Sequence, residues 1–163
     1  MSARACIARP VGDGWEGVSN HYDGQPTGLG IVLLNIYDTS SAADPAADMI
    51  ATLIDAHPHG WVRAGEECNC DTHPSQAAAQ RYHCTCPLPT TECQPLHIEW
   101  AYVIAGTGLF VYRAVDVSGL DIAAYASAMA AGELVNGGYT HELAGHVAWG
   151  DYAAMRALEV SDQ

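Results

Sequence analysis

Lysine is missing from this chain of 163 residues, so its six Lys/Arg positions are all arginines. Without lysine the chain has no phosphate-binding loop ending in Gly-Lys-Ser/Thr, no Schiff-base lysine and no kinase-type strand lysine. The 19 acidic residues give a formal net charge of −13 at pH 7. Because such a surface repels phosphate groups, we expect no direct binding of DNA or RNA.

Long apolar runs are also lacking. No window of the chain approaches the roughly 20 apolar residues that a membrane-spanning helix needs. Residues 1–14 contain no apolar core of the kind that a secretion signal has. We therefore expect a cytoplasmic protein that makes no membrane contact. In that reducing compartment the six cysteines are expected to be metal ligands or thiols rather than disulfides.

The chain is long enough for one compact domain, and neither a repeat nor a linker divides residues 1–163. Strand-length segments joined by glycine-rich turns predict two β-hairpins, one spanning residues 2–22 and one spanning residues 97–115. A less regular strand is expected at residues 139–149. We therefore predict the α+β class, with an antiparallel sheet built from the two hairpins, about three helices and a long Cys/His-rich loop.

Candidate helices are marked by their capping residues. Asp44 followed by Pro45 is typical of an N-cap and a first helical position. Asp151 is expected to cap a final helix in the same way. The other segments with helical composition are residues 29–37 and 121–131.

Residues 66–96 lack any hydrophobic period and instead concentrate cysteine and histidine. A loop of this length in a compact domain is usually held by something other than packing. Thiolate and imidazole are the ligands that four-coordinate zinc prefers, and two close ligand pairs joined by a loop can complete a tetrahedron. We predict a metal-binding insertion in which zinc is held by Cys68, Cys70, Cys84 and Cys86. The residues that would replace one of these ligands are His73, His83, Cys93 and His97.

Two disulfides or scattered thiols are the alternative to a metal site. If zinc is present, four thiolates make a closed structural site, whereas three protein ligands and a water make a catalytic one. The catalytic version is a zinc-dependent hydrolase with Glu99 or Asp71 as its base. No acid or base is visibly placed beside the cysteines, so the sequence favours a structural zinc and a protein that is not an enzyme.

The loop at residues 21–26 brings an imidazole, a phenol and a carboxylate together in one turn from strand to helix. Asp23 in this place is typical of a helix cap, which is the structural interpretation. The functional interpretation is a polar binding site formed by His21, Tyr22 and Asp23, because loops carry binding residues disproportionately. Both interpretations stay open at this level.

A second histidine pair, His141 and His146, resembles the metalloprotease signature but is spaced by five residues instead of four. On a helix this spacing separates the two side chains by about 140°. On a regular strand it places them on opposite faces. The sequence therefore argues against a protease.

The motif His-Tyr-Asp-Gly-Gln-Pro at residues 21–26, followed by the apolar residues 28–37, resembles an uncharacterised family of tailed bacteriophages and actinobacteria. In that family the motif reads His-Trp-Asp-Gly-Tyr-Pro, so this chain departs from it at Tyr22 and Gln25. Residues 97–103 resemble a later strand of the same family, whereas the cysteine-rich segment has no counterpart there. The resemblance implies a phage-type accessory protein in a bacterial cytoplasm, and it implies no known reaction.

These observations predict a zinc-stabilised protein-binding module without enzymatic activity, which acts on a host factor. A charge of −13 favours a partner with a basic surface. The alternatives are a zinc-dependent hydrolase, a virion or assembly component, and an acidic mimic of DNA. The mimic would need carboxylates at the spacing of phosphates, and the acidic residues of this chain are scattered along the sequence.

Overall fold

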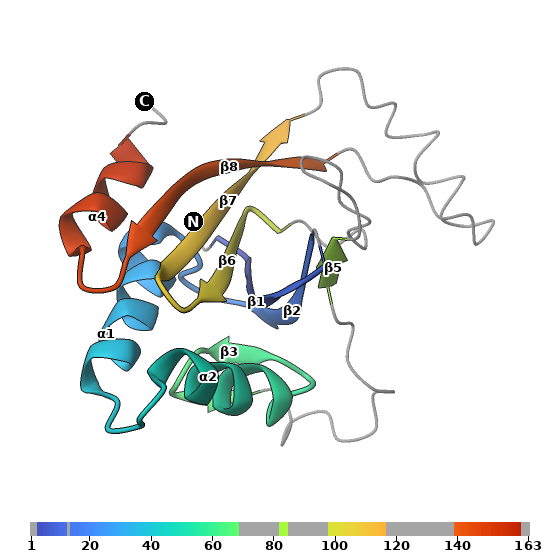
Figure 1. Cartoon of the computed structure of the whole chain (residues 1–163). Helices are drawn as coiled ribbons and strands as arrows, with labels where there is room; N and C mark the ends of the chain where they lie inside the picture. Colours follow the sequence, from blue (N-terminus) through green and yellow to red (C-terminus); the bar gives the residue numbers. More distant parts are fainter. Residues whose placement is uncertain (1–2, 13, 69–81, 85–97, 117–138, 161–163) are drawn as a thin grey trace.

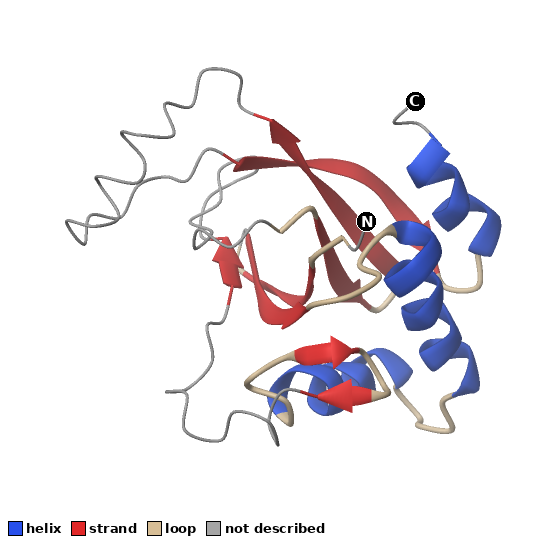
Figure 2. Cartoon of the chain, turned by 180° about the vertical axis from the view of Figure 1, so that it is seen from behind, coloured by secondary structure: helices blue, strands red, loops and turns tan. Residues whose placement is uncertain are grey.

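A computed structural model of the chain describes residues 3–12, 14–68, 82–84, 98–116 and 139–160. Its centre is a curved sheet of eight strands, with helices packed beside it (Figures 1 and 2). The strands are β1 (Ala5–Val11), β2 (Gly14–Asn20), β3 (Trp61–Arg63), β4 (Glu67–Cys68), β5 (Tyr82–Cys84), β6 (Trp100–Ala105), β7 (Gly108–Asp116) and β8 (Tyr139–Ala148). They follow the order β4-β3-β2-β1-β6-β7-β8, and β5 pairs with β2.

Both predicted hairpins are present. β1 and β2 pair antiparallel around a turn at Gly12, whose φ of 57° is a conformation that glycine adopts without strain. β6 and β7 form the second hairpin, and β8 extends it antiparallel along the other side of β7. The strand expected at residues 139–149 is therefore confirmed.

The two hairpins join through a parallel pair, so the prediction of an antiparallel sheet made from two hairpins is wrong. β1 and β6 run parallel, with Ala5 opposite Trp100. A second parallel pair joins β2 to β3 at Asn20 and Trp61. The alternation of apolar residues along one strand does not reveal the direction of its neighbour, because both directions use the same period of two. The sheet is mixed.

Side chains on both faces of the central strands are buried. Along β1, Ala5 and Ile7 pack toward the helices, whereas Cys6 and Ala8 pack on the opposite face. β6 alternates in the same way, and Trp15 of β2 is the bulkiest side chain on the second face. Burial of both faces is the environment in which parallel strand pairs are found.

The helices confirm the segments predicted near the N-terminus and at the C-terminus. They are η1 (Pro26–Gly30), α1 (Ile31–Thr39), α2 (Pro45–Met49), η2 (Ile50–Asp55) and α4 (Tyr152–Val160). η1 and η2 are π-helical turns that continue into α1 and out of α2. The helix predicted at residues 121–131 lies outside the described residues. No helix in the described ranges has the length and apolar character needed to span a bilayer.

Asp44 and Asp151 cap their helices as predicted. The Oδ1 atom of Asp44 accepts a hydrogen bond from the main-chain N–H of Ala47 at 3.1 Å. The Oδ1 atom of Asp151 accepts one from Ala154 at 3.0 Å. Each bond satisfies one of the main-chain donors that the first turn of a helix leaves unpaired.

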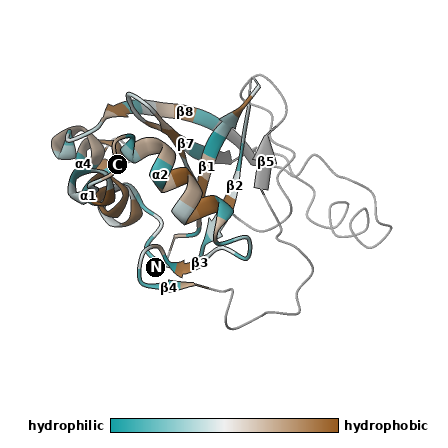
Figure 3. Cartoon of the chain, turned by 60° about the horizontal axis from the view of Figure 1, so that its bottom comes forward, coloured by the Kyte–Doolittle hydropathy of each residue, from teal (hydrophilic) through white to brown (hydrophobic). Residues whose placement is uncertain are grey.

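α1 contacts both α2 and α4, and it is hydrophobic along most of its length (Figure 3). The ring of Tyr37 near its end stacks on Trp149, with the two ring centroids 4.1 Å apart. The hydroxyl of Tyr152 on α4 donates to the Asp38 carboxylate at 2.6 Å, and this bond raises the pKa of Tyr152. These contacts fix α4 beside α1.

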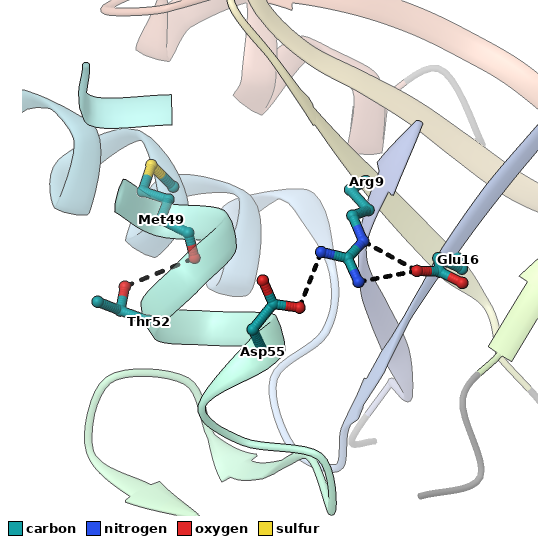
Figure 4. A network of polar contacts seen from close by, with 5 residues as sticks. All are labelled: Arg9, Glu16, Met49, Thr52 and Asp55. Atoms are coloured by element: carbon teal, nitrogen blue, oxygen red, sulfur yellow. Dashed lines mark hydrogen bonds and ion pairs between the residues drawn. The ribbon is translucent and has the colours of Figure 1, made fainter. Parts of the chain in front are cut away.

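Arg9 joins the first hairpin to the helical layer (Figure 4). Its guanidinium lies 2.8 Å from a carboxylate oxygen of Glu16 on β2 and 2.8 Å from one of Asp55 at the end of η2. All three side chains are partly exposed, so each pair contributes less than about 1 kcal/mol. The network therefore orients η2 against the hairpin more than it stabilises the fold.

Candidate functional site

The turn at residues 21–26 connects β2 with η1, and the buried side chain of Asn20 holds it from beneath. Asn20 is 1% exposed. Its Nδ2 donates to the carbonyl oxygen of Tyr22 at 2.6 Å, and its Oδ1 accepts from the N–H of Ala64 at 2.9 Å. The main chain of the turn adds two further hydrogen bonds to β3. Because the buried amide is paired through both of its polar atoms, it fixes the turn without leaving an unsatisfied group.

Gly24 is pressed against β1. Its N–H donates to the carbonyl oxygen of Ala3 at 2.9 Å, and its own carbonyl accepts from the buried hydroxyl of Tyr102 at 2.7 Å. A Cβ atom at this position would lie 2.7 Å from the Ala3 oxygen, so the site accepts only glycine without rearrangement. Burial, with a smaller contribution from Glu159, raises the pKa of Tyr102 well above its ordinary value. The tyrosine therefore stays neutral and keeps donating this bond.

Asp23 has a φ of 56°, and it is the non-glycine residue with positive φ in the described part of the chain. Its carbonyl oxygen accepts a hydrogen bond from Leu29 at 2.7 Å. Gly28 allows this approach, because a Cβ there would lie 2.3 Å from the same oxygen. A left-handed conformation costs roughly 1–2 kcal/mol for residues other than glycine, less for Asp and Asn. The surrounding contacts maintain it.

The outer side of this turn carries four exposed side chains, His21, Tyr22, Asp23 and Arg63, which we call the exposed turn. The His21 ring meets the Tyr22 ring edge-on, with the centroids 4.4 Å apart. The Arg63 guanidinium carbon lies 5.4 Å from the Tyr22 ring centroid, and Arg63 Nε lies 3.4 Å from Asp23 Oδ2. The three residues predicted from the sequence are thus brought together, and β3 adds an arginine to them.

Asp23 is not the cap of the following helix, so the structural interpretation of its carboxylate is wrong. The residue at the N-cap position is Gln25, whose side chain makes no capping bond. Glu159 of α4 holds the helix start instead, because its carboxylate accepts from both the N–H and the hydroxyl of Thr27. The Asp23 carboxylate turns to Arg63, while its main-chain oxygen bonds to Leu29.

Sequence reasoning missed three residues that shape this site: Asn20, Tyr102 and Arg63. Arg63 lies 40 residues beyond Asp23, in a strand of three residues that is too short to show an alternating pattern. Asn20 and Tyr102 lie within strand-like segments, where their polar groups give no sign of a role in the turn. The signal that could have pointed to Asn20 is its position directly before the motif. Asparagine side chains often hydrogen-bond the main chain of a following turn.

Two cysteines of the predicted zinc set, Cys68 and Cys84, lie within the described residues. Cys68 lies opposite Trp61, which in turn lies opposite Asn20 at the end of β2. Cys84 lies opposite Trp15 near the start of β2. The two ladders meet β2 at positions five residues apart, which is roughly 17 Å along a strand.

This arrangement does not bring Cys68 and Cys84 together. Two sulfur ligands of one zinc ion lie at most about 4.6 Å apart, because each Zn–S bond measures about 2.3 Å. The alternate ligand His83 lies opposite Glu16 on β2. In the described part of the chain no three His, Cys, Asp or Glu residues gather in a metal-binding group. The zinc site stays a prediction, since its other members lie outside the described residues: Cys70, His73, Cys86, Cys93 and His97.

The histidine pair lies on strand β8, which excludes the helical arrangement of the metalloprotease signature. A bulge at Ala144 adds one residue to the ladder between β8 and β7. His141 lies opposite Ala114, and His146 lies opposite Phe110.

The two carboxylates considered as a hydrolase base are not placed beside a metal-binding group in the described ranges. Glu99 is exposed just before β6, and Asp71 lies outside the described residues. Comparisons with protein families, with curated proteins and with solved structures find no match to this chain.

Proposed function

We propose that the chain is a protein-binding module and that the exposed turn is its contact surface. One observation carries the proposal: a fixed main chain displays exposed side chains. Asp23 keeps a left-handed conformation that its surroundings maintain, and the neighbouring Tyr22 is 40% exposed. Backbone strain of this kind persists mainly where a protein uses the resulting geometry, at binding loops and active sites.

The composition of the exposed turn suits a protein partner. Tyrosine and arginine are the residue types that most often dominate protein–protein interfaces, together with tryptophan. Here Arg63 lies against both Tyr22 and Asp23, so the side chains are partly ordered before a partner arrives. Less conformational entropy is then lost on binding, which leaves more of the contact energy as affinity.

We propose a partner with a basic surface. Exposed Glu66 and Glu67 follow Arg63 in the chain, and the whole molecule carries a charge of −13. A field of this sign attracts a basic partner and accelerates the encounter at low salt. The resemblance of the motif to the phage family favours a host protein as this partner.

We also propose that a structural zinc holds the insertion at residues 66–96, with one of Cys68 and Cys84 replaced by an alternate ligand because the strand ladders keep these two apart. This part of the proposal rests on the ligand types alone. A zinc site of this kind would stabilise the segment that follows β4 without taking part in the contact made by the exposed turn.

Quantitative affinity capture tests the contact surface. The wild-type chain, Tyr22→Ala and Val32→Ala are immobilised at equal density, and bound proteins from a bacterial lysate are quantified by mass spectrometry. Val32 is the matched control because it is 39% exposed on α1, close to the 40% of Tyr22. Each variant is first checked for an unchanged unfolding midpoint.

The proposal expects a basic protein that the wild type and Val32→Ala retain equally. Tyr22→Ala should retain at least roughly tenfold less of this basic protein, which is the loss typical of a central interface tyrosine. Raising the salt concentration should weaken the capture further. Identical captured proteins in identical amounts on all three chains would show that the exposed turn is not the contact surface.

A further inference from the structure

β8 forms one end of the sheet within the described residues. Its strand partner there is β7, and its ten residues make it the longest described strand. The opposite end of the sheet is β4, which has two residues. The N–H and C=O groups that point away from the last strand of a sheet are a template for another strand. Among the described strands, β8 thus offers one long edge for pairing.

The usual protections of a sheet edge are few on β8. Proline, lysine and bulges are the features that normally prevent pairing with another chain. Residues 139–148 contain no proline, and lysine is absent from the whole chain. The bulge at Ala144 lies in the second half of the strand, so residues 139–143 form an uninterrupted ladder with β7. This stretch is long enough for a short strand to pair with it.

Two neighbouring side chains give this stretch a different chemistry on each face. Glu142 lies opposite Arg113 and pairs with its guanidinium at 3.0 Å, while its side chain stays 50% exposed. Leu143 lies opposite Tyr112 and is also 50% exposed, so its apolar side chain can contact an added strand. Because successive strand residues point to opposite faces, an added strand meets a carboxylate on one face and an apolar side chain on the other.

We propose that β8 binds an extended segment of a partner protein in which basic and apolar residues alternate. The basic side chains lie beside Glu142, and the apolar ones lie beside Leu143. In strand addition the main-chain hydrogen bonds supply affinity, and the alternate side chains supply specificity. A charge of −13 favours a basic strand in this place and opposes a second copy of the chain, which brings the same charge.

This surface is separate from the exposed turn. The turn follows the end of β2, and β1, β6 and β7 lie between β2 and β8 in the sheet. The inference therefore does not depend on Tyr22, and Tyr22→Ala should leave binding at β8 unchanged. Failure of one surface can be told apart from failure of the other.

A designed peptide of eight residues, with alternating lysine and valine and blocked ends, is the probe. The control peptide has proline at its two central valines, which keeps the charge and prevents strand pairing. Binding to the full chain is measured by calorimetry, and amide hydrogen exchange locates it. Leu143→Lys places on the edge a charged side chain of the kind that prevents pairing with another strand. Val160→Lys, at a position 70% exposed on α4, makes the same charge change away from it.

The lysine-valine peptide should bind, slow the exchange of amides within residues 139–143, and bind roughly tenfold more weakly to Leu143→Lys. Val160→Lys should bind it as the wild type does within about twofold, and the proline peptide should not slow these amides. The proposal is overturned if both peptides bind equally, since binding would then reflect charge alone. It is also overturned if protection appears elsewhere, or if sedimentation shows a dimer of the wild-type chain that Leu143→Lys abolishes.

Discussion

Gly24 is the residue on which the geometry of the exposed turn depends most. A Cβ atom there would lie 2.7 Å from both the Ala3 oxygen and the Ala5 Cβ. Gly24→Ala should therefore lower the free energy of unfolding by about 2 kcal/mol, the cost of forcing a packed backbone apart. Gly106→Ala is the control, because nothing lies within 4 Å of its added carbon. Urea unfolding of the two variants measures the difference, and equal stabilities would contradict the described packing.

Tyr102 makes the stability of the turn depend on pH at the alkaline end. Burial raises the pKa of Tyr102 above the value near 10 that the unfolded chain has. The folded state then holds a proton that the unfolded state releases, so this contribution is complete below pH 10 and is lost as the pH rises through the folded pKa. Tyr102→Phe should remove this part of the decline.

Unfolding of wild type and Tyr102→Phe between pH 8 and the onset of alkaline denaturation measures the effect. At neutral pH the variant should be less stable by about 1 kcal/mol, because the carbonyl oxygen of Gly24 loses its buried donor. The gap between the two proteins should narrow as the pH rises above 10. A gap that stays constant would mean that the Tyr102 hydroxyl titrates as it does in the unfolded chain.

At the scale of elements, the sequence predicted those helices and strands that a pattern of neighbouring residues marks. Asp44 before Pro45 predicted the start of a helix, and the glycine-containing turns predicted both hairpins. β3 had no such signal, since residues 61–63 are too few to display alternation. Arg63 lies on that strand, so no pattern in the sequence could predict its position beside Tyr22. The parallel joining of β1 to β6 was missed because strand direction is set by contacts far apart in the chain.

The zinc prediction belongs to the same scale, because it concerns the insertion between β4 and β6. Elemental analysis of protein purified without a metal resin should find one zinc ion per chain, with all six thiols reduced. Cys68→Ser and Cys84→Ser then separate the two ends of the predicted set. Since the strand ladders hold these residues roughly 17 Å apart along β2, only one variant should lose the metal and several degrees of melting temperature.

Two other outcomes of that experiment are decisive. Absence of zinc, or unchanged melting in both variants, would refute a structural metal site, because its loss should remove several kcal/mol of stability. Loss of zinc from both variants would show that Cys68 and Cys84 share one ion and would contradict their separate places along β2.

At the scale of the whole molecule, the described part of the sheet is buried on both faces. Ile7 and Cys6 show the pattern on a single strand, since both are fully buried on opposite faces. The two binding surfaces proposed here lie at the margins of this core. The exposed turn follows the end of β2, and β8 is the last described strand at one end of the sheet. The motif at residues 21–26 pointed to the first of these, and only the strand order pointed to the second.

The central claim is that the exposed turn is rigid before any partner binds, and amide hydrogen exchange of the free protein tests it most directly. The amides to follow are Tyr22, Gly24 and Leu29, which donate to main-chain oxygens of Val62, Ala3 and Asp23. A rigid turn predicts that they exchange as slowly as amides in the centre of β1 and β6, because only large openings of the fold would release them. Exchange near the rate of an unfolded chain at these three amides would show that the turn is not preorganised and would contradict the account.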